Sequence, residues 1–163
     1  EWKVPEDCWT YLLRNNLMPL AEQLITDFEV EPLFVCTLIA HDIKGRIRVN
    51  RKAFDFTKLA VIFTFLKEHN IRWELVKEMI PIMIEHPKID CQSVFNLLNW
   101  EKENPESLFS AVPYFTKTVL KDCRIDCNED AIKWVMGKLR PRALGNVDMK
   151  ELFTAIEMQI RQG

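Results

Sequence analysis

The sequence predicts an all-α protein, with a helical bundle followed by a small three-helix C-terminal subdomain. Only four of the 163 residues are glycine, and glycine supplies the positive-φ positions that hairpin turns and phosphate-binding loops require. Apolar residues recur at the three- and four-residue spacing of amphipathic helices, and several prolines stand where such segments begin. These observations argue against β-barrels, β-sandwiches and Rossmann domains.

Proline introduces the first three segments. Pro5, Pro19 and Pro32 each open or precede a stretch of helical spacing, and proline fits the first turn of a helix because its missing N–H is not needed there. We therefore expect helices at residues 5–15, 19–27 and 33–44. Gly45 stands at the position of a C-terminal cap for the third helix, and a polar loop is expected at residues 46–52.

Residues 54–69 are apolar on nearly all sides, which indicates a central buried helix. The Val-Ile-Phe-Thr-Phe run in this segment is also compatible with a buried strand, because periodicity alone does not separate the two. Asp55 and Thr57, which can cap a helix, favour the helical interpretation. Two further helices are expected at residues 73–84 and 92–100.

Residues 101–107 are entirely polar. Few contacts cross a segment of this kind, so the sequence predicts a boundary there between two subdomains, residues 1–103 and residues 104–163. After the boundary we expect three helices, at residues 108–121, 129–139 and 148–162. The last two are separated by a basic turn at residues 140–146.

No catalytic, cofactor-binding or metal-binding constellation stands out in the sequence. The chain has no P-loop, GxGxxG, GxSxG or HExxH motif. Cys36 and His41 lie about 140° apart around their predicted helix, so they do not form a nucleophile–base pair by themselves. The spacing of Cys123 and Cys127 is not that of a zinc knuckle. We therefore expect a non-catalytic protein with no cofactor and no bound metal.

The five cysteines are irregularly spaced, mostly among apolar residues, which predicts buried reduced thiols and a cytoplasmic location. No run of 18 or more apolar residues is present, so we expect no membrane association. The chain opens with Glu1 rather than methionine, which leads us to expect a fragment of a longer protein.

The net charge is −2, but positive side chains are concentrated in two runs that contain no acidic residue. The candidate binding residues are Lys44, Arg46, Arg48, Arg51 and Lys52 in the first run and Lys138, Arg140 and Arg142 in the second. One interpretation is that these cations complement the C-termini of the preceding helices. The other is a pair of loops that bind the RNA phosphate backbone, since backbone contacts supply most of the affinity when RNA is recognised by shape.

The segment from Ala131 to Leu152 resembles the closing motif of the GatB/YqeY tail domain, which ends the B and E subunits of tRNA-dependent amidotransferases. The features that match in kind and order are Met136, Gly137, Lys138, Arg140, Arg142, Gly145 and residues 147–152. Residues 13–24 and 34–48 are similar to earlier segments of the E-type tail. The resemblance implies an all-helical domain in two parts, without catalytic residues, that grips the outer corner of tRNA. It also implies other amidotransferase subunits or domains as partners.

Two hypotheses from different functional classes follow. In the first, the chain is a non-catalytic tRNA-binding appendage, and both basic runs face the tRNA backbone. In the second, it is a helical protein–protein interaction module without RNA binding, which docks a partner through an apolar groove or through its acidic first 43 residues. The net charge and the aromatic content suit the second hypothesis equally well.

Overall fold

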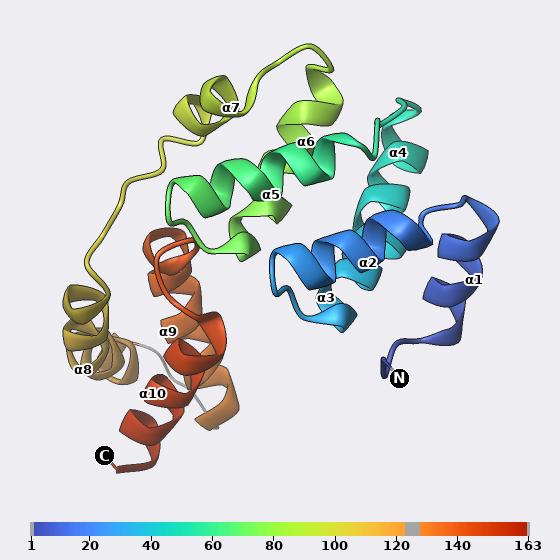
Figure 1. The fold of residues 1–163 in the computed structure, drawn as a ribbon. Helices are drawn as coiled ribbons and strands as arrows, with labels where there is room; N and C mark the ends of the chain where they lie inside the picture. The colour runs from blue at the N-terminus through green and yellow to red at the C-terminus, as the bar shows by residue number, and fades with distance from the viewer. Residues whose placement is uncertain (1, 123–127, 163) are drawn as a thin grey trace. The chain divides into compact units, whose positions relative to one another are not determined.

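The computed structural model of the protein describes residues 2–122 and 128–162. All regular secondary structure within these residues is helical, which confirms the predicted all-α fold (Figure 1). The chain divides into two compact units, Glu1–Asn99 and Trp100–Gly163. Of the helices in the described ranges, none combines the length and the apolar composition needed to cross a bilayer.

The first unit is a series of short helices. In chain order they are α1 (Glu6–Arg14), α2 (Met18–Asp27), α3 (Pro32–Thr37), the π-helix η1 (Leu38–Ile43), α4 (Lys44–Asn50), α5 (Lys58–Glu68), the 3-10 helix η2 (Trp73–Leu75), α6 (Val76–Glu85) and α7 (Cys91–Leu97). Pro5 directly precedes α1, and Pro19 and Pro32 stand in the first turns of α2 and α3. The prolines thus mark helix starts because their fixed φ suits the first turn.

α5 supplies an inner face to the core of the first unit. Leu59, Ile62, Phe63 and Leu66 are all buried, whereas Val61 is 60% exposed. The expectation that residues 54–69 form a helix buried on nearly all sides was therefore wrong in two respects. The helix begins only at Lys58, after a turn in which Asp55 accepts a hydrogen bond from the Thr57 N–H, and its outer side is open to solvent.

The second unit contains α8 (Pro105–Asp122), α9 (Asn128–Ala143) and α10 (Met149–Gln162), which pack against one another (Figure 1). Their facing sides form one apolar core, to which α9 contributes Ala131, Val135 and Leu139, all fully buried. Leu152 and Ile156 of α10 complete it from the facing helix. The three- and four-residue spacing of these positions is the pattern of an amphipathic helix.

The segment before α8 is bound to the end of α9. The indole Nε1 of Trp100 donates a hydrogen bond to the carbonyl of Leu144 at 2.7 Å. The Glu103 N–H donates to Asn146 Oδ1, and Asn146 Nδ2 donates to the carbonyl of Glu101, each at 3.0 Å. These bonds explain why the unit begins at Trp100, whereas polarity placed the boundary after residue 103.

Candidate nucleic-acid interface

Most of the first basic run lies on a helix, so the loop predicted at residues 46–52 was wrong for residues 46–50. Lys44, Arg46 and Arg48 belong to α4, which continues directly from η1. Gly45 lies inside α4 and does not cap a helix. The helix ends instead where Arg51 adopts a left-handed conformation with φ of 52°, so a non-glycine residue takes the position for which glycine was expected.

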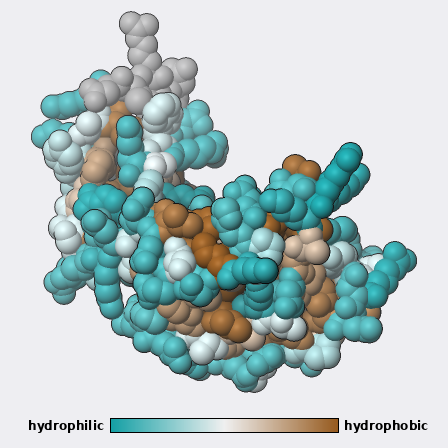
Figure 2. Space-filling view, turned by 90° about the horizontal axis from the view of Figure 1, so that it is seen from above, coloured by the Kyte–Doolittle hydropathy of each residue, from teal (hydrophilic) through white to brown (hydrophobic). Residues whose placement is uncertain are grey.

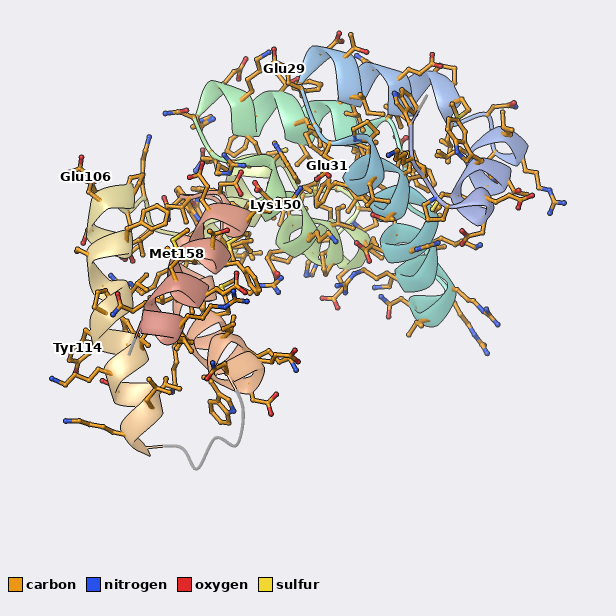
Figure 3. All side chains as sticks on the ribbon, turned by 90° about the horizontal axis from the view of Figure 1, so that it is seen from below. Glu29, Glu31, Glu106, Tyr114, Lys150 and Met158 are labelled. Atoms are coloured by element: carbon orange, nitrogen blue, oxygen red, sulfur yellow. The ribbon has the colours of Figure 1, made fainter. Side chains whose placement is uncertain are left out.

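α4 contributes no buried residue to the core. The side chains of all five cations of this run, Lys44, Arg46, Arg48, Arg51 and Lys52, are exposed. Even the apolar Val49 is 80% exposed. In Figure 3, long side chains with nitrogen at their ends project from this turquoise helix. α4 is therefore a solvated basic helix whose position depends on its junction with η1.

Four of these cations make no ion pair. Within residues 2–122 and 128–162, no side-chain hydrogen bond or ion pair engages Arg46, Arg48, Arg51 or Lys52. Lys44 differs, because its ammonium lies 4.7 Å from the centre of the Tyr11 ring. It also lines a shallow hollow of about 540 Å³ together with the acidic Glu6 and Asp7.

Helix stability accounts for only part of this clustering, since Arg48 lies in the last turn of α4 and Arg51 caps it. The helix dipole favours cations only in the last turn, which includes Arg48 but not Arg46. Lys44 and Arg48 are four residues apart, a spacing at which like charges destabilise an isolated helix by roughly 0.2–0.5 kcal/mol. The helix dipole therefore gives no reason for the positions of Lys44 and Arg46.

The second basic run also lies on a helix. The turn predicted to begin at residue 140 was wrong, because α9 extends to Ala143 and carries Lys138, Arg140 and Arg142. All three side chains are exposed. Gly145 follows the helix with φ of 84°, a left-handed conformation that glycine adopts without steric cost. α9 therefore ends close to this glycine and not at residue 139, where the sequence predicted its end.

Arg142 has a structural partner in the second unit. Its Nε donates to Glu103 Oε1 at 2.8 Å and its Nη2 donates to Glu103 Oε2 at 2.7 Å. The hydrogen bonds from Arg142 hold the pKa of Glu103 below its usual range, and the carboxylate raises the pKa of Arg142 in turn. This bidentate pair ties the segment before α8 to the last turn of α9.

We expect Glu103→Gln to lower the Tm of the second unit by a few degrees at neutral pH, because the variant loses the charged partner of Arg142. The pKa of Glu103 is lowered in the folded state. Its stabilising contribution is therefore present above the ordinary pKa of glutamate and is lost as the pH falls through the lowered value.

Thermal unfolding followed by circular dichroism, from neutral pH down to about pH 3, measures this effect. The two proteins should differ in Tm at neutral pH and converge in acid. Glu101→Gln, at an exposed position two residues away and outside any helix, is the matched control and should leave Tm nearly unchanged. An equal deficit of Glu103→Gln at all pH values would mean that the ion pair is not the cause.

An exposed tryptophan on α9 is a feature that the sequence analysis missed. Trp134 is 53% exposed and lines a shallow hollow of about 430 Å³ with Lys133, Gly137 and Lys138. A Cβ added at Gly137 would have no atom within 4 Å. The sequence spacing could have predicted this pairing, because Trp134 and Lys138 are four residues apart and share one helix face. An aromatic ring beside lysines is a surface on which nucleic-acid bases stack.

The first unit also carries an apolar groove of about 710 Å³ along α5. Val61, Phe65, Met83 and Ile89 are among its lining residues, and the acidic Glu68 also lines it. Apolar side chains reach the surface between hydrophilic ones on the face in Figure 2. A groove of this composition suits an apolar partner rather than a nucleic-acid backbone.

Three of the five cysteines fall within the described residues, and the prediction of buried reduced thiols is confirmed for them. Cys8, Cys36 and Cys91 are buried and free. Burial raises the pKa of the Cys36 thiol to about 11, so this side chain stays protonated at neutral pH. Cys123 and Cys127 lie outside the described residues.

No family model matches the chain, and it has no match among curated proteins or solved structures. The resemblance to the GatB/YqeY tail therefore stays a prediction.

Proposed function

We propose that this chain is a non-catalytic RNA-binding module in which α4 and the adjoining Arg51 and Lys52 contact the phosphate backbone. The observation that supports it is a set of four exposed cations, Arg46, Arg48, Arg51 and Lys52, which form no ion pair with any residue that the structure describes. The resemblance of residues 131–152 to an amidotransferase tail makes tRNA the expected RNA. The parent complex would then supply the catalytic domains.

The chemistry of these side chains supports a phosphate ligand. Three of the four are arginines, whose planar guanidinium groups donate paired hydrogen bonds to phosphate oxygens. No acidic residue interrupts the run, so no carboxylate within it offsets the charge of these four side chains. Backbone contacts of this kind bind RNA without reading its sequence.

The hollow beside Trp134 supports a second contact on the other unit. Lys138 is exposed and makes no ion pair with any described residue. Its ammonium can meet a phosphate while an unpaired base stacks on the indole of Trp134, an interaction worth roughly 1–3 kcal/mol per base. Arg142 is left out of this contact, because Glu103 already engages its guanidinium.

The test is the salt dependence of tRNA binding after Arg46, Arg48, Arg51 and Lys52 are all replaced by glutamine. Each phosphate neutralised contributes about −0.7 to −0.9 to the slope of log K against log salt. If each of the four cations neutralises one phosphate, the variant slope should be shallower by about 2.8 to 3.6, and its affinity at low salt should fall by about 10²-fold. Fluorescence anisotropy of labelled tRNA, titrated at several salt concentrations, gives both quantities.

A second quadruple variant controls for net charge alone. Lys88, Lys102, Lys117 and Lys121 are exposed and scattered over both units, and their replacement by glutamine removes the same four charges. We expect this variant to keep most of the salt slope of the wild-type protein. Equal slopes in the two variants would contradict a role for α4 in particular, and no binding of tRNA by the wild-type protein at low salt would overturn the proposal.

One observation favours the alternative of a protein–protein interaction module, namely the apolar groove along α5. Its expected occupant is an amphipathic helix with a basic residue facing Glu68, since such helices dock their apolar face into grooves. Partner capture that survives RNase and is lost in Val61→Glu would favour this alternative over RNA binding.

A further inference from the structure

A carboxylate, a thiol and an imidazole meet in the first unit. Asp7 and Cys8 lie in the first turn of α1, and His41 lies in η1. His41 Nε2 is 2.6 Å from Asp7 Oδ2 and 3.5 Å from Cys8 Sγ. The three atoms all lie within 4.8 Å of one another. No sequence motif indicates this cluster, because the histidine is 33 residues away from Cys8.

Both contacts of His41 involve the same ring nitrogen. A neutral imidazole nitrogen carries either one proton or one lone pair. If Nε2 donates its proton to Asp7, it has no lone pair left to accept the Cys8 thiol proton. A neutral His41 can therefore form a hydrogen bond through Nε2 with either Asp7 or Cys8, but not with both. A catalytic triad is also excluded, because in a triad the nucleophile and the carboxylate use opposite nitrogens of the ring.

A metal ion would satisfy all three groups. A tetrahedral zinc ion with bonds of about 2.3 Å to sulfur and about 2.1 Å to nitrogen holds these two ligand atoms about 3.6 Å apart, close to the 3.5 Å between Cys8 Sγ and His41 Nε2. The carboxylate oxygen would move from 2.6 Å to about 3.3 Å from Nε2. The side chains of Asp7 and His41 are 67% and 46% exposed, so they are free to make this adjustment around the buried Cys8.

The backbone at His41 gives a second, independent indication. η1 is a π-helix, and such turns are rare and frequently occur at functional sites. In a regular helix, His41 would lie about 140° from Cys36. The wider π turn changes that direction, and the imidazole lies against the first turn of α1.

We propose that Asp7, Cys8 and His41 bind one divalent transition-metal ion, with Zn²⁺ as the expected ion. Sulfur, imidazole and carboxylate ligands together suit Zn²⁺ better than the oxygen-seeking Mg²⁺ or Ca²⁺. Three protein ligands leave one coordination position for a water molecule or for a group from a ligand. Cys8 binds as the thiolate, so its proton leaves to solvent when the ion enters. This site does not depend on RNA binding.

Titration of the reduced protein with Co²⁺ tests the site, because Co²⁺ takes zinc sites and a thiolate ligand produces an intense near-ultraviolet charge-transfer band. We expect this band to saturate at one Co²⁺ per chain and to disappear when Zn²⁺ is added. Cys8→Ser should abolish the band. Asp7→Asn and His41→Asn should weaken the affinity by about tenfold or more.

Asp7 and His41 are exposed, so substitutions there leave the core intact, and a loss of metal affinity in these variants does not result from unfolding. Circular dichroism of every variant checks that helix content is kept. Cys91→Ser and His69→Asn remove a buried thiol and an imidazole elsewhere in the unit and should leave the titration unchanged. The proposal is overturned if the wild-type protein shows no thiolate band, or if the band depends on Cys91 and not on Cys8.

Discussion

Replacement of Phe63 by alanine is expected to destabilise the first unit by about 3–5 kcal/mol. The side chain is 1% exposed, and its ring centre lies 5.7 Å from that of Phe28. Removal of the ring loses its burial and leaves a cavity. The neighbouring Ile62 and Leu66 are held by the same helix, so the surrounding side chains fill the space only in part.

Urea unfolding followed by circular dichroism measures this loss as a shift in midpoint at constant slope. The matched control is Val61→Ala, two residues away on α5, where the side chain is 60% exposed. We expect this control to change stability by about 0.5 kcal/mol or less. Similar losses in the two variants would mean that α5 has no distinct buried face.

Leu139→Ala should destabilise the second unit by about 2–5 kcal/mol. Leu139 is fully buried in the core that α9 shares with α8 and α10. At roughly 0.05–0.15 kcal/mol per residue, a unit of this size has a free energy of unfolding of about 3–10 kcal/mol, so the substitution should remove a large share of it. The result would be a lower transition temperature for this unit alone.

Lys138→Ala is the matched comparison, because it changes the adjacent residue on the exposed side of α9. We expect it to alter stability by no more than about 0.5 kcal/mol. Calorimetry measures the transition temperature of each variant. A large decrease for Leu139→Ala and none for Lys138→Ala would show that Leu139 stabilises the packing of α9, whereas Lys138 contributes only its charge. Should Lys138→Ala unfold the second unit as Leu139→Ala does, its effects on RNA binding would carry no information about a direct contact.

The helical class and most helix positions follow from local chemistry. Pro5, Pro19 and Pro32 mark helix starts because proline suits the first turn wherever it stands. Helix ends were harder to predict, and Gly45 shows why. Glycine ends a helix when the chain needs a positive φ at that point, but α4 continues through Gly45 and the left-handed residue is Arg51.

The candidate sites were predictable only in part, because charge runs are local and contacts are not. The exposed cations of α4 follow from a run without acidic residues. The pairing of Arg142 with Glu103 does not follow from the sequence pattern, since Glu103 lies 39 residues earlier in the chain. The contact between His41 and Asp7 was also not predictable, because the two residues lie far apart in the sequence. The π-helix that contains His41 leaves no recognisable periodicity in the sequence.

Because η1 continues directly into α4, η1 determines the directions in which the side chains of α4 point around the helix axis. No loop separates the two elements, and α4 has no buried residue that could orient it independently. A π turn acts like the insertion of one residue, and one residue rotates every later side chain by about 100° around the helix axis. The direction in which Arg46 and Arg48 point is therefore set by the turn that holds His41.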